Sequence, residues 1–221
     1  AESLHRAMNI AHHPDVSTLM TCAAGSQPEA LCAVVASHLS VCRTCMNEVS
    51  RLERIGVALF EKLDPAPVVA MTAPMAAAEY SLSQAVGQCE LHRSPGDVPT
   101  PLSGLIGPRL DDVDWRPLGK GVWQFPIPLS KSAKGDLRLI KIAPGRALPK
   151  YGARGEELAL VLRGACRDGA NVFAPGDFTD RDDGADRLIA ADEKLGSILL
   201  IANESELSFG EPQLPFAGRF A

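Results

Sequence analysis

The spacing of apolar residues divides the chain into two parts. In the first part, apolar residues recur every three or four positions, as at Leu31, Val34, Val35 and Leu39, which is typical of amphipathic helices. We expect helices over residues 15–24, 26–41, 42–63 and 76–92, with Asp15 or Ser17 capping the first helix and Ser26 capping the second. In the second part, short apolar or alternating runs are separated by turns rich in Gly, Pro and Asp. These runs predict antiparallel strands over residues 122–127, 137–143, 158–163, 171–174 and 197–202.

The boundary between the two patterns is the stretch from Ser94 to Pro101. Three prolines and one glycine in this stretch do not continue a helix. We therefore predict an α+β protein of two domains. Residues 1–93 form a helical domain of about four helices, residues 94–103 a Pro-rich linker, and residues 104–221 an antiparallel β-barrel.

Composition and charge narrow the function classes. With 46% hydrophobic and 22% charged residues the chain has an ordinary folded composition, which argues against an intrinsically disordered protein. A net charge of −5 argues against direct DNA binding through a broad basic surface. The longest apolar runs, such as residues 31–36, are far shorter than the ~18–20 residues that span a bilayer. No membrane segment or secretory signal is expected, and we predict a cytoplasmic protein.

A histidine and two cysteines form the clearest chemical motif. His38, Cys42 and Cys45 have the spacing H-x3-C-x2-C, and on an α-helix these positions fall within an arc of roughly 60°. If the helix breaks before Cys42, the C-x-x-C pair can still close as a turn. Two thiolates and an imidazole suit zinc, and a fourth ligand completes a tetrahedron. His13 is the best candidate for this fourth ligand, and His12 is the alternative. Cys32 is a poorer candidate, because it lies on another face of the helix that carries His38.

The same motif is compatible with two arrangements that hold no metal. A C-x-x-C pair also occurs as a redox dithiol, but that motif usually follows a strand, and no strand is expected before Cys42. The histidine can also be a packed residue without a metal. We favour one structural zinc ion held by His13, His38, Cys42 and Cys45.

These residues carry a resemblance to a known family. The segments HPDVSTLMTCAAG (13–25) and ASHLSVCRTC (36–45) resemble the ChrR-type zinc-binding anti-sigma factors, which join such a helical domain to a C-terminal cupin domain. The resemblance implies a non-enzymatic regulator linked to stress responses. Its zinc domain would sequester an extracytoplasmic-function-type sigma factor. Its cupin domain would act as a sensory module or a dimerisation module, so that a homodimer is expected.

The second half keeps the spacing of the cupin motif but loses its histidines. From Gly145 to Gly164 the motif G-x5-H-x-H-x3-E-x6-G is matched in length, and a second motif is visible at residues 174–177. The four ligand positions that the resemblance implies hold Tyr151, Ala153, Glu157 and Arg187. Tyrosine is a poor ligand, alanine offers no donor, and arginine repels cations, so we expect no cupin metal. Glu157 and Arg187 either pair with one another, or point into solvent, or hold a small anion through Arg187.

Two competing functions are also compatible with the sequence. The first alternative is a cupin-fold enzyme or a small-ligand-binding protein with a helical zinc appendage, and the second is a zinc-dependent redox switch. All five histidines lie before residue 93, so the second half has none for acid–base catalysis. This absence weighs against an enzyme and favours a regulatory protein.

Overall fold

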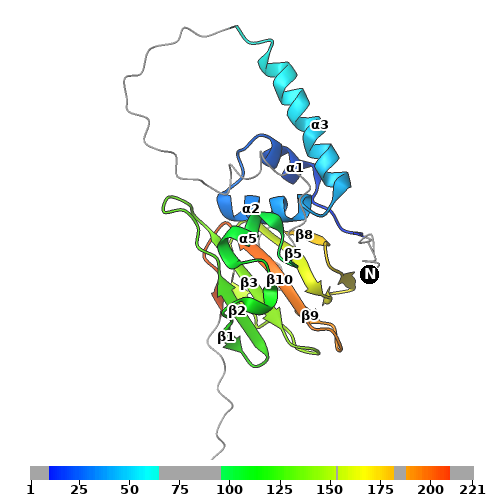
Figure 1. Cartoon of the computed structure of the whole chain (residues 1–221), viewed down its shortest axis with the longest axis vertical. Coiled ribbons are helices and arrows are strands. Elements are labelled where there is room, and N and C mark those ends of the chain that lie inside the picture. The colour runs from blue at the N-terminus through cyan, green and yellow to red at the C-terminus, as the bar shows by residue number, and fades with distance from the viewer. Residues whose placement is uncertain (1–9, 65–95, 153, 182–187, 210–221) are drawn as a thin grey trace, which may run out of the picture.

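The computed structural model describes residues 10–64, 96–152, 154–181 and 188–209. Helices precede strands, as the apolar pattern predicts (Figure 1). The helices are α1 (Val16–Ala23), α2 (Glu29–Leu39), α3 (Arg43–Phe60) and α5 (Thr100–Ile106), followed by the short 3-10 helix η1 (Leu110–Asp112). The helix predicted over residues 76–92 lies outside the described residues. None of the helices in the described ranges is both long and apolar enough to cross a membrane.

The described strands form antiparallel sheets. The largest sheet has the order β1-β2-β3-β10-β5-β8, with strands Arg116–Gly119, Val122–Pro126, Asp136–Ile142, Ser197–Asn203, Glu157–Gly164 and Phe178–Arg181. A three-stranded sheet has the order β7-β6-β9, with strands Asn171–Phe173, Cys166–Asp168 and Ile189–Ala191. Strands β11 (Ser208–Phe209) and β4 (Tyr151–Gly152) form a pair. The predicted barrel is therefore not closed, because the strands of the smaller sheets are only two or three residues long and their ladders end early.

The centre of the largest sheet is buried on both faces, as strand β10 shows. Its side chains alternate, so that Leu199 and Ile201 join the apolar cluster toward the smaller sheets. Ile198 and Leu200 join the cluster on the opposite face, which also contains residues of α2. All seven residues of β10 are buried, as expected for a central strand covered on two sides.

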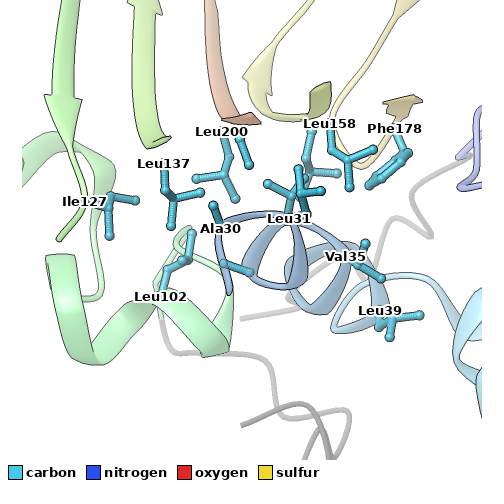
Figure 2. Packing of buried hydrophobic residues seen from close by; sticks show 14 of the residues in the cluster. Ala30, Leu31, Val35, Leu39, Leu102, Ile127, Leu137, Leu158, Phe178 and Leu200 are labelled. Carbon is cyan, nitrogen blue, oxygen red and sulfur yellow. The ribbon is translucent and has the colours of Figure 1, made fainter. Parts of the chain in front are cut away.

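Helix α2 covers the second face of this sheet. Ten of its eleven residues are buried. Figure 2 shows Leu31 and Val35 pointing toward sheet residues that include Leu158 and Leu200. A helix that is apolar on all sides must be covered on all sides, and α1, α3 and α5 also contact α2. Each fully buried leucine in this layer contributes about 1.5–3 kcal/mol relative to an exposed one.

The N-termini of the first two helices differ in their caps. Asp15 caps α1 by accepting a hydrogen bond from the backbone N–H of Thr18 at 2.7 Å, as predicted. The prediction that Ser26 caps the second helix is wrong, because α2 begins at Glu29 and has no side-chain cap. The Glu29 carboxylate instead accepts from the backbone N–H of Ser130, at 3.0 Å, and from the hydroxyl of Ser130. The first turn of α2 is therefore tied to the second half of the chain.

The segment predicted as a linker is folded from Thr100 onward. Pro101 lies in the first turn of α5, where a missing N–H costs nothing. Leu102 is fully buried in the cluster that contains α2 and the sheet. Asp97 accepts a hydrogen bond from the N–H of Leu110 at 2.8 Å. The division into domains at residues 94–103 stays a prediction, and the described helices and sheet share one core.

Candidate metal centre

Four side chains from three places in the chain gather at the ends of the helices. His13 precedes α1, His38 lies in the last turn of α2, Cys42 is the N-cap of α3, and Cys45 lies in its first turn. Their ligand atoms all lie within 4.8 Å of one another. The helix breaks between α2 and α3, so the C-x-x-C pair closes at the start of α3 and not within a continuous helix. These four residues are the metal ligands that the sequence predicts.

Three separations between ligand atoms match those around a tetrahedral ion. Nδ1 of His13 lies 3.4 Å from Sγ of Cys42 and 3.4 Å from Sγ of Cys45. Nε2 of His38 lies 3.3 Å from Sγ of Cys45. Zinc–nitrogen bonds of about 2.0–2.1 Å and zinc–sulfur bonds of about 2.3 Å at tetrahedral angles space neighbouring ligand atoms about 3.3–3.8 Å apart. Three separations match this spacing and the others are at most 4.8 Å, so a bound metal ion would draw the remaining ligand atoms closer together.

The surroundings of His38 keep its imidazole neutral and set its tautomer. Its side chain is fully buried, and its Nδ1 lies 3.0 Å from the carbonyl oxygen of Gly176. Because a carbonyl only accepts hydrogen bonds, Nδ1 carries the proton and Nε2 keeps its lone pair toward Cys45. Burial lowers the pKa of His38 to about 4, so the imidazole is neutral at neutral pH.

Burial controls the protonation of the Cys45 thiol. Burial and the neighbouring Cys42 raise the pKa of the Cys45 thiol to about 12. Reactive cysteines have lowered pKa values, so this thiol alone is a poor nucleophile. A bound cation reverses the preference, because a metal ion stabilises the thiolate directly. Without a cation the Cys45 thiol is therefore protonated at neutral pH, and a bound metal ion would hold it as the thiolate.

The structure distinguishes the two adjacent histidines. His13 reaches the cysteines, whereas the ring of His12 packs 4.5 Å from that of Phe173, measured between centroids. Nδ1 of His12 lies 3.4 Å from Oδ2 of Asp177. Cys32 is buried in α2 and is not part of the cluster. The contacts of His38 with Gly176 and of His12 with Asp177 were not expected, since no spacing motif connects residues 138 and 165 positions apart.

The predicted cupin pocket is only partly within the described residues. Oη of Tyr151 donates a hydrogen bond to Oε1 of Glu157 at 3.0 Å, and the Tyr151 ring packs against Phe209. Glu157 is only 6% exposed, so the alternative in which it points into solvent is wrong. Ala153 and Arg187 lie outside the described residues. The absence of a cupin metal therefore stays a prediction.

Three comparisons with known proteins find the same family. The family model "ChrR Cupin-like domain" matches residues 105–198. The anti-sigma-E factor ChrR of Cereibacter sphaeroides is 37% identical over 210 residues, which cover 91% of this chain and 93% of that protein. A chain in the crystal structure of Rhodobacter sphaeroides SigE in complex with the anti-sigma ChrR matches with a TM-score of 0.69 and 37% identity. The match covers 88% of this chain and 99% of that one. This chain therefore belongs to the ChrR family of anti-sigma factors.

Proposed function

We propose that this chain is an anti-sigma factor that binds an extracytoplasmic-function-type sigma factor and keeps it from RNA polymerase. The observation that carries the proposal is its 37% identity, over nearly its whole length, to a protein whose structure was solved in complex with the sigma factor SigE. The role is regulatory and needs no catalytic group. The partner is a protein, and the net charge of −5 disfavours direct contact with DNA. Because sigma factors act on RNA polymerase, the site of action is the cytoplasm.

The C-terminal half of α3 offers a surface for this partner. Helix α3 extends away from the sheet in Figure 1. Five apolar side chains at its end, or just beyond it, are 49–76% exposed: Ile55, Val57, Leu59, Phe60 and Leu63. Exposed apolar residues that cluster, unlike scattered single ones, mark interaction sites. We propose that this end of α3 packs against the sigma factor.

The metal in this proposal is zinc, and its role is structural. Two thiolates and two imidazoles are a common ligand set of structural zinc sites. The ion ties the segment before α1 to the end of α2 and the start of α3, and its binding free energy adds to the stability of the helical region. The second half, without a cupin metal, serves as a sensory or dimerisation module. The expected homodimer can be checked by sedimentation equilibrium of the full chain.

Co-purification tests the proposed function. The full chain, tagged and purified from its native cell, is expected to retain a sigma factor. Phe60→Asp places a charge on the proposed surface and is expected to weaken this association at least about tenfold, as for an interface residue that contributes about 1.4 kcal/mol or more. Leu195→Asp is the matched control, because Leu195 is 70% exposed in the turn between β9 and β10. Failure to retain any sigma factor, or equal loss in both variants, would contradict the proposal.

A further inference from the structure

A turn in the second half of the chain contacts two of the segments that supply the metal ligands. Residues 174–177 lie between β7 and β8, far from the helices in sequence. The Gly176 carbonyl accepts from Nδ1 of His38 and thereby sets the orientation and the tautomer of that ligand. One of the four ligand side chains therefore depends on the position of this turn.

Asp177 holds the backbone that leads to a second ligand. Its side chain is 3% exposed, and its Oδ1 accepts from the backbone N–H groups of Ala11 at 2.7 Å and of His12 at 3.0 Å. Its Oδ2 accepts from the N–H of Ala174 at 2.8 Å, which fixes the carboxylate within its own turn. The N–H of Phe178 donates to the His12 carbonyl at 3.1 Å. Three hydrogen bonds thus fix the two residues that precede His13.

We propose that Asp177 is a positioning residue of the metal centre, and that metal binding and the packing of the helices on the sheet strengthen one another. The inference rests on the zinc proposed above. Cys42 and Cys45 lie at the start of α3, whereas His38 and the backbone before His13 contact the turn of the second half. If docking of this turn raises the affinity for the metal, the metal raises the affinity of docking by the same factor.

Through this coupling, a structural change in the second half alters the metal centre that joins the helices. A ligand or modification that moves residues 174–178 removes the carbonyl that accepts a hydrogen bond from His38. It also removes the hydrogen bonds that hold the backbone before His13. Partners that orient metal ligands typically change metal affinity about 10–100-fold when they are substituted. A signal received by the second half can therefore loosen the metal centre without touching any of its four ligands.

Metal affinity of full-length variants tests the inference. Asp177→Asn keeps the size of the side chain but replaces one acceptor oxygen with a donor group. We expect its zinc affinity, measured by chelator competition, to fall about 10–100-fold while its far-ultraviolet circular dichroism is retained. The cobalt-loaded variant is expected to keep the absorption bands of two sulfur and two nitrogen ligands. Asp192→Asn is the control, because Asp192 also accepts from two backbone N–H groups, those of Lys194 at 2.9 Å and Leu195 at 3.0 Å, but within its own turn between β9 and β10. This control is expected to keep its zinc affinity.

Amide hydrogen exchange of the unsubstituted full chain gives a second measurement. Chelation of the metal is expected to speed exchange at the Phe178 amide, whereas Leu200, in the centre of the sheet, stays protected. Unchanged zinc affinity in a folded Asp177→Asn variant, or an unchanged Phe178 amide after chelation, would overturn the coupling and leave the zinc proposal standing. If the unsubstituted chain binds neither zinc nor cobalt, the zinc proposal fails and this inference fails with it.

Discussion

Substitution of Leu31 by alanine tests whether the helices and the sheet fold as one unit. Leu31 lies on α2, is 0% exposed and points toward the sheet (Figure 2). Its truncation removes three carbon atoms from a close-packed layer and leaves a cavity, which in other proteins costs about 2.7–5 kcal/mol. For a chain of this size, about 3 kcal/mol lowers the melting temperature by about 6–12 °C.

Two optical signals separate the parts of the molecule in this experiment. The two tryptophans of the chain, Trp115 and Trp123, both lie in the second half, so their fluorescence follows the sheet. Circular dichroism at 222 nm follows mainly the helices. Because α2 and the sheet share one core, Leu31→Ala is expected to lower both transitions by the same amount. Leu59→Ala is the control, because Leu59 is 61% exposed on α3 and its loss should change stability by less than about 0.5 kcal/mol.

A difference between the two signals would refute this reasoning. If Leu31→Ala lowers the helical transition and leaves the tryptophan transition in place, the two halves unfold independently. The division at residues 94–103 would then describe two stable domains, and the packing of α2 on the sheet would contribute little to the stability of either. Equal shifts of both transitions would mean that the parts before and after residues 94–103 unfold together as one cooperative unit.

The remaining predictions concern metal binding. Cys42→Ala combined with Cys45→Ala is expected to reduce zinc, measured by elemental analysis, from about one per chain to none and to lower the thermal stability of the helices. Cys32→Ala should keep the zinc, and full zinc in the double variant would contradict the assignment. Restoring histidine at Tyr151, Ala153 and Arg187 together is expected to add a second zinc or nickel ion per chain, because three imidazoles then join Glu157. A second transition metal already present in the unaltered chain would contradict this prediction and would mean that other side chains have taken over as ligands.

The elements of the fold were largely predictable from the apolar pattern. Strands expected at 122–127, 137–143, 158–163, 171–174 and 197–202 correspond to β2, β3, β5, β7 and β10. The other strands have two to four residues, which is too short for an apolar period to be visible in the sequence; the equally short β7 was predicted only because clear turns flank it. The position of α2 was not predictable either, because an apolar helix does not indicate which surface it covers. Its burial on the sheet becomes evident only when the outward residues of β5 and β10 are seen to be apolar as well.

The metal centre was predictable in its ligands but not in its surroundings. Spacing brings His38, Cys42 and Cys45 together because short-range geometry is set by the helix and its break. The choice of His13 over His12 depends on the contact of His12 with Asp177, which forms only in the folded chain. Contacts of this kind have no local sequence signal, so neither the supporting turn nor its role could be read from the motif.

The contact with Gly176 explains why an imidazole is used at position 38. A third cysteine there would also supply a metal ligand, but a thiolate has no proton to donate to the Gly176 carbonyl. In a site where the side chain is fully buried, a carbonyl that loses its donor costs about 1–3 kcal/mol. Histidine has two ring nitrogens, so it can bind a metal through Nε2 and donate a hydrogen bond to the Gly176 carbonyl through Nδ1 at the same time. One side chain at the end of the most buried helix therefore joins metal binding to the packing of the two halves.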